Sequence, residues 1–85
     1  MRRSIDDARD DHPADDEERP GASWAVALED ACDGCGEGAL RVVVTLEEVG
    51  RPGLGVIAHL APDTARRLRS AIAAALKEIG EPPGA

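Results

Sequence analysis

The sequence contains neither Phe nor Tyr, and Trp24 is its single aromatic residue. A hydrophobic core must therefore be built from Val, Leu, Ile and Ala, which bury less area per side chain than aromatic rings do. At 85 residues the chain is one domain at most, and such a domain buries only about 60% of the surface that its unfolded chain exposes. We therefore expect a bound metal or a partner surface to help stabilise it.

Positive charge is also scarce, and the formal net charge is −7. This charge has the wrong sign for general attraction to nucleic-acid phosphates or anionic lipid, so we expect neither nucleic acid nor membrane as a partner. The sequence lacks an apolar run of the roughly 18 residues that a membrane span needs. The N-terminal MRRSIDDARDD has charges where a signal peptide is apolar. These features predict a cytoplasmic protein whose two cysteines are reduced.

Catalytic motifs are missing as well. The glycines of CGEG and GRPGLG lie between predicted strands, whereas a P-loop or a dinucleotide fingerprint lies between a strand and a helix. The serines at positions 4, 23 and 70 have no GxSxG context. We therefore expect a protein that is not an enzyme. Nine arginines stand against one lysine, a usage typical of GC-rich genomes such as actinobacterial ones.

Residues 1–22 are rich in charge and poor in apolar side chains, with eight acids and four arginines. Such a segment cannot bury enough surface to offset the entropy of ordering, so we predict a disordered acidic arm. The interpretation we favour is a solvated tail that keeps the protein soluble. The alternative is a lure for a basic partner, or a mimic of nucleic-acid charge.

Residues 23–80 form the predicted folded domain. Large apolar residues alternate with small or charged ones in 24–28, 40–46 and 54–60, which is the two-residue period of half-buried strands. The turn signal Pro52-Gly53 joins the last two segments. Aligning even-numbered positions with even-numbered positions places the apolar residues of both strands on one face.

A helix is predicted over residues 62–79, because Pro62 suits a first helical position and Gly80 a position just after a helix. Its apolar residues recur at three- and four-residue spacing, which produces one stripe able to cover the sheet. We therefore predict an α+β fold, in which a two- or three-stranded antiparallel meander packs against one C-terminal amphipathic helix. Residues 81–85 are expected to be a short flexible tail.

Several residues outside this core are candidates for an interaction surface. On the sheet face turned away from the helix, Val43 and Ile57 are apolar in a mostly polar field, which is typical of an interface that another subunit extends. On the helix, Ala71 and Ala74 would allow a second helix to approach closely. Arg66 and Arg69 would form part of a basic side that could hold the acidic arm or an acidic partner. The sequence thus favours a homodimer that also binds another protein. The alternative for each of these residues is an ordinary role, as a solvated side chain or as part of the core.

The segment Cys32-Asp33-Gly34-Cys35-Gly36 is where chemistry could occur. A Cys-x-x-Cys turn can place two thiolates on one tetrahedral ion, and the glycine after it lets amide groups point at sulfur. A closed zinc site needs four ligands, and the chain has no third cysteine. The interpretation we favour from sequence is a glycine-rich turn with two ordinary thiols and no cofactor.

A zinc site is the alternative, and its ligand set could be completed in two ways. In an antiparallel hairpin, His59 would lie across from about Arg41 or Val43, a few residues from the cysteine loop, and could be a third ligand. Otherwise two copies of the loop could meet across a dimer axis.

The order of strand, loop with Asp-Gly, paired strands and helix carries one family resemblance. Its residues are VALEDACDGCGEGALRVVV and VIAHLAPDTARRLRSAIAAALKEIG. The arrangement resembles the N-terminal dimerisation domain of the actinobacterial H-NS-like nucleoid bridging proteins over about residues 24–80. The chain lacks that family's C-terminal arginine-glycine-arginine DNA-binding domain. The resemblance therefore implies a dimerising module without DNA binding, with a regulatory or accessory role.

Overall fold

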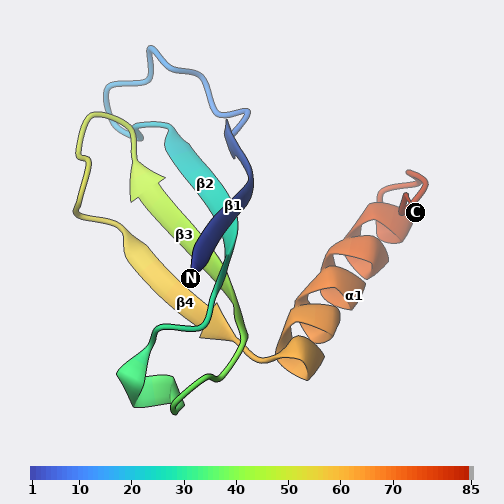
Figure 1. The fold of residues 1–85 in the computed structure, drawn as a ribbon. Coiled ribbons are helices and arrows are strands. Elements are labelled where there is room, and N and C mark those ends of the chain that lie inside the picture. Colours follow the sequence, from blue (N-terminus) through green and yellow to red (C-terminus); the bar gives the residue numbers. More distant parts are fainter. Residues whose placement is uncertain (85) are drawn as a thin grey trace.

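A computed structural model describes residues 1–84 of the chain. It contains one antiparallel sheet and one C-terminal helix (Figure 1), which confirms the α+β class. The helix ends at Glu78, one residue before the predicted end at residue 79. The elements, in chain order, are β1 (Arg2–Arg9), β2 (Ala22–Glu29), the single 3₁₀ turn η1 (Asp33–Cys35), β3 (Arg41–Glu48), β4 (Val56–Leu60) and α1 (Pro62–Glu78).

The sheet has four strands in the order β1-β2-β3-β4, instead of the two or three that were predicted. The additional strand, β1, lies inside the segment predicted to be a disordered arm. All eight of its residues are exposed, so it is held by backbone hydrogen bonds to β2 and not by burial. Ion pairs also join its start to the end of β2, since the Met1 amino group lies 2.6 Å from Asp30 Oδ1 and Arg2 Nη1 lies 3.8 Å from Glu29 Oε2.

The acidic residues of the predicted arm lie mainly in the connection between β1 and β2, where Asp16 organises a turn. Its Oδ1 accepts hydrogen bonds from the backbone amides of Glu18 at 2.9 Å and Arg19 at 3.1 Å, and its Oδ2 lies 2.9 Å from His12 Nε2. These contacts lower the pKa of the Asp16 carboxyl, with the Arg19 amide as the largest cause. The acidic connection therefore contains local order that composition alone does not predict.

The pairing of β3 with β4 confirms the predicted register. Val42 pairs with Leu60, Val44 with Ala58 and Leu46 with Val56, so the even-numbered apolar side chains share one face. The odd-numbered residues share the other face, where Val43 pairs with His59.

Burial is concentrated at the centre of the odd-numbered face. Within residues 1–84 the buried hydrophobic residues are Ala27, 4% exposed, and its cross-strand partner Val43, 1% exposed. Val43 thus belongs to the core, although the sequence analysis placed it on an exposed interface, because β2 and β4 flank it on both sides. Ile57 does not pair with it directly, since Ile57 lies opposite Thr45 and is exposed.

Helix α1 begins beside the end of β4 and runs away from the sheet at an angle (Figure 1). Pro62 occupies the start as predicted. Gly80, just after the helix, has a φ of 81°, and its amide donates to the Lys77 carbonyl. The apolar stripe lies on the sheet side, yet α1 contacts the sheet mainly at β3 and β4, and Leu68 and Ile72 stay exposed. In the part of the chain that the structure covers, α1 and η1 are both too short or too polar to cross a membrane.

Candidate metal centre

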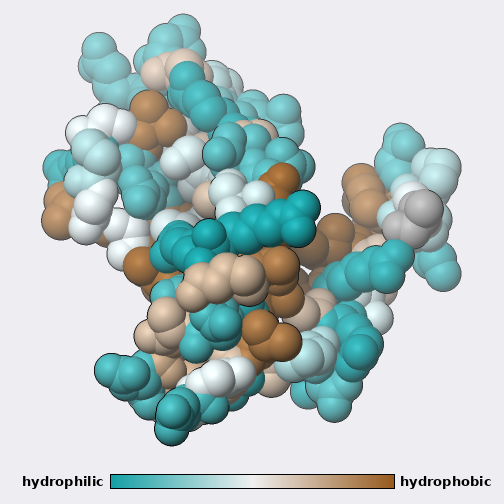
Figure 2. Space-filling view, viewed as in Figure 1, coloured by the Kyte–Doolittle hydropathy of each residue, from teal (hydrophilic) through white to brown (hydrophobic). Residues whose placement is uncertain are grey.

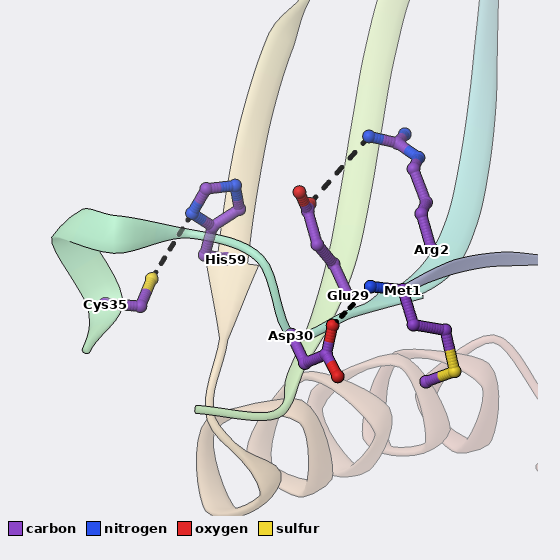
Figure 3. A network of polar contacts seen from close by, with 6 residues as sticks. All are labelled: Met1, Arg2, Glu29, Asp30, Cys35 and His59. Carbon is purple, nitrogen blue, oxygen red and sulfur yellow. Dashed lines mark hydrogen bonds and ion pairs between the residues drawn. The ribbon is translucent and has the colours of Figure 1, made fainter. Parts of the chain in front are cut away.

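Cys32, Cys35 and His59 come together at one end of the sheet (Figure 3 shows Cys35 and His59). One ligand atom from each residue lies within 4.8 Å of the other two, and Cys35 Sγ is 3.4 Å from His59 Nδ1. Both cysteines are half-buried free thiols, whereas the histidine is exposed. The three residues that sequence analysis proposed as metal ligands therefore form a single cluster.

The cysteine loop folds back on itself through short-range backbone hydrogen bonds. The Cys35 amide donates to the Cys32 carbonyl at 3.2 Å, and the Gly36 amide donates to the Asp33 carbonyl at 3.2 Å. Gly36 has a φ of 114°, a conformation that residues with a Cβ rarely adopt. This glycine after the second cysteine thus allows the tight turn that holds both sulfur atoms on one side.

The register of the hairpin delivers the histidine to this loop. Because β4 is antiparallel to β3, its last residues lie beside the first residues of β3, where the chain has just left the cysteine loop. Arg41, the first residue of β3, also ties the loop down, since its guanidinium donates to the Leu40 carbonyl at 3.0 Å and to the Cys35 carbonyl at 3.5 Å. This contribution of Arg41 depends on the loop conformation, which no pattern in the sequence predicts.

The Cys32 thiol influences the protonation of Cys35. Their hydrogen bond raises the pKa of Cys35, with partial burial and the charge of a Cys32 thiolate as further causes, while Arg41 acts in the opposite direction. A pair of adjacent thiols resists carrying two negative charges unless a cation neutralises them. A raised pKa disfavours the thiolate form of Cys35, the nucleophile of thiol chemistry, and a bound cation would displace the proton of this thiol.

The spacing of the cluster matches a tetrahedral zinc site. Zn–S bonds of about 2.3 Å and Zn–N bonds of about 2.0–2.1 Å place ligand atoms roughly 3.5–4 Å apart in tetrahedral geometry. The separation of 3.4 Å between Cys35 Sγ and His59 Nδ1 and the 4.8 Å upper bound for the cluster need only small side-chain adjustments to meet this. Two sulfurs and one imidazole nitrogen are also a donor set that zinc prefers.

Of the residues predicted to form an interaction surface, Val43 pairs directly with the candidate ligand His59, whereas the helix residues are not part of the cluster. Ile57 is on β4, and Ala71, Ala74, Arg66 and Arg69 are on α1, all of them exposed. Arg66 also pairs with Asp63, one turn earlier on the helix.

Comparisons with known proteins found no match among protein-family models, curated proteins or solved structures. The resemblance to the nucleoid bridging proteins therefore stays a prediction. What the fold and site define is an α+β chain with a Cys₂His cluster, and functional inference depends on that geometry.

Proposed function

We propose that this protein binds one zinc ion through Cys32, Cys35 and His59. The observation that carries the proposal is the convergence of the three ligand atoms within 4.8 Å of one another, from a loop and a strand that are more than twenty residues apart in the chain. This geometry favours zinc over the inert turn that the sequence alone favoured.

The proposed role of the ion is structural. Zinc would join the η1 loop to the end of β4, and so would tie together two segments of a chain that has little buried apolar surface. Small domains of this kind gain folding free energy directly from a bound metal. The fourth position is left to water or to a donor atom from another molecule. We place the protein in the cytoplasm, where thiols stay reduced and able to bind metal.

Cobalt(II) titration of the purified full-length chain tests this proposal, because cobalt bound to thiolate absorbs strongly in the near ultraviolet and zinc then displaces it. We expect one equivalent per chain. Serine at both cysteine positions should abolish the thiolate absorption. His59→Gln should weaken binding by more than the roughly 10–100-fold that loss of an outer-shell partner costs.

The second histidine supplies a matched control. His12 lies in the β1–β2 connection and contacts Asp16, so His12→Gln should bind cobalt as the natural chain does. Absence of thiolate absorption, or equal affinity of the His59→Gln and His12→Gln variants, would overturn the proposed ligand set.

We propose self-association as a second function, in which the protein is an interaction module without enzymatic activity. The observation that favours it is the exposure of large apolar side chains on both α1 and the sheet, Leu46, Val56, Leu68, Ile72 and Ile79 among them. The basic side of α1, with Arg66 and Arg69, is the surface we propose for an acidic protein partner. Light scattering at micromolar concentration should give the mass of a dimer, and a well-folded monomer would contradict self-association.

A further inference from the structure

An apolar hollow separates α1 from the sheet. It has a volume of about 750 Å³, and hydrophobic residues border the gap between the helix and the body of the molecule (Figure 2). Val26, Val42, Val44 and Leu60 line it from the sheet. Leu68 and Ile72 line it from the helix, and the basic side chains of Arg66, Arg69 and Lys77 border it. The helix stripe and the even-numbered sheet face therefore point toward each other without closing together.

The side chains that should seal such an interface are left in water. Ile72, in the middle of α1, is 55% exposed, and Val56, on the same sheet face as Val44, is 72% exposed. Apolar surface that is contiguous in this way is characteristic of protein interaction sites. Something with an apolar surface of its own is needed to fill the hollow.

We propose that the occupant is α1 of a second copy of this chain, inserted reciprocally, so that each helix lies between the sheet and the helix of its partner. The inference rests on the proposed self-association and specifies its geometry. A two-fold arrangement of this kind is self-complementary, because the helix stripe that needs a cover and the sheet face that needs a cover are present in both copies.

The available apolar area agrees with a dimer. At about 60–120 Å² for each aliphatic side chain, the exposed parts of Leu46, Val56, Leu68, Ile72 and Ile79 amount to on the order of 300 Å² per copy. A stable interface buries about 800 Å² per partner, of which rather more than half is apolar. Val26, Val42, Val44 and Leu60, which line the hollow, are half-buried and add to this area.

The charge distribution also favours a second copy. Helix α1 has four basic and two acidic residues, which give it a formal charge of +2. Because the net charge of the chain is −7, the rest of the chain has a formal charge of −9. Reciprocal insertion brings each positive helix to the negative body of the partner, while the basic side chains that border the hollow, Arg66, Arg69 and Lys77, keep their charged ends in solvent. Such complementarity steers association and fixes its orientation.

Charge substitutions on opposite sides of α1 test the arrangement by light scattering and sedimentation. Ile72→Glu lies in the hollow. Ala74→Glu lies on the exposed outer side of the helix, the side that Ala71 and Ala74 would offer to a second helix packed outside the hollow, so it tests that alternative. We expect Ile72→Glu to raise the dimer dissociation constant at least about 100-fold, since each buried side chain is worth tenfold or more and the two-fold axis counts it twice. Ala74→Glu should leave the constant unchanged.

Mixing two variants shows whether the helix contacts the sheet of the other chain. Ile72→Glu and Val44→Lys should each be largely monomeric alone, and circular dichroism should confirm that both remain folded. An equimolar mixture should form heterodimers, because the glutamate of one helix then meets the lysine of the partner sheet. Failure of the mixture to associate would overturn helix insertion.

The possible results separate the two levels of the proposal. A natural chain that is monomeric overturns self-association and the insertion geometry together. A dimer that Ala74→Glu dissociates and Ile72→Glu does not would overturn insertion alone. Because the measurements are made with chelator and with saturating zinc, they do not depend on the proposed metal site.

Discussion

At the scale of single residues, Gly55 is the glycine whose backbone lies closest to a neighbouring strand, because β3 leaves no room for a side chain at this position. A Cβ at this position would lie 2.5 Å from the Leu46 carbonyl oxygen and would also collide with Glu47 Cγ. The carbonyl cannot move without disturbing β3. We therefore predict that Gly55→Ala lowers the free energy of unfolding by about 1–3 kcal/mol, as overpacking usually does. Urea denaturation of the metal-free chain measures the change.

The control for this substitution is Gly34→Ala. A Cβ on Gly34 would have only Cys32 Sγ nearby, at 3.9 Å, which is an ordinary van der Waals contact. Its unfolding free energy should stay within about 0.5 kcal/mol of that of the natural chain. Equal losses from the two substitutions would show that the close approach at Gly55 does not determine the effect.

Asp16 gives the acidic connection a predicted pH dependence. Its folded-state pKa is lowered, first by the hydrogen bond from the Arg19 amide and next by that from the Glu18 amide. Its contribution to stability is thus present above the ordinary carboxyl pKa and is lost as the pH falls through the folded-state value. We expect the amide resonances of Glu18 and Arg19 to move together toward random-coil positions in this acidic range, and NMR titration follows them.

Replacement of the titrating group is the control for that titration. In Asp16→Asn the carboxylate is absent, so these two amides should show no such acid transition. A transition of the same size in the variant would mean that another acidic residue of the connection is responsible.

At the scale of elements, the sequence predicted the strands and the helix that have one apolar face. It did not predict the strand that only backbone pairing holds in the sheet. The alternation in β3 and β4 determined their register, and the register placed His59 beside Cys35, so the candidate site followed from local patterns. Strand β1 is exposed throughout and therefore has no pattern to reveal it. The stripe on α1 indicated an apolar partner, but periodicity does not show whether that partner belongs to the same chain.

The η1 loop is the element that the proposed metal should affect most. A few backbone hydrogen bonds, the contact from Arg41 and the contact between Cys35 and His59 hold it, whereas the β2–β3 ladder pairs along eight residues. We predict that chelation of zinc accelerates amide exchange in the loop and at the end of β4 and leaves exchange in β2 and β3 nearly unchanged. Hydrogen-exchange mass spectrometry with and without chelator measures both regions.

A variant with serine at positions 32 and 35 is the reference for the metal-free loop. It should show fast loop exchange whether or not zinc is added. Equal loop protection of the natural chain with zinc and with chelator would contradict a structural role for the ion.

At the scale of the whole molecule, stability should depend on protein concentration, because a dimer that unfolds to two separate chains is favoured by mass action. A tenfold increase in concentration is worth about 1.4 kcal/mol per dimer. With an unfolding entropy of about 2.1 cal/mol/K per residue, the melting temperature should rise by about 4 °C for each tenfold step. Calorimetry at saturating zinc, from micromolar concentrations upward, measures this slope.

Ala74→Glu should keep the slope and Ile72→Glu should lose it, since only the second change puts a charge into the hollow between α1 and the sheet. A melting temperature of the natural chain that stays constant across this range would show that the exposed apolar faces are not covered by a second copy.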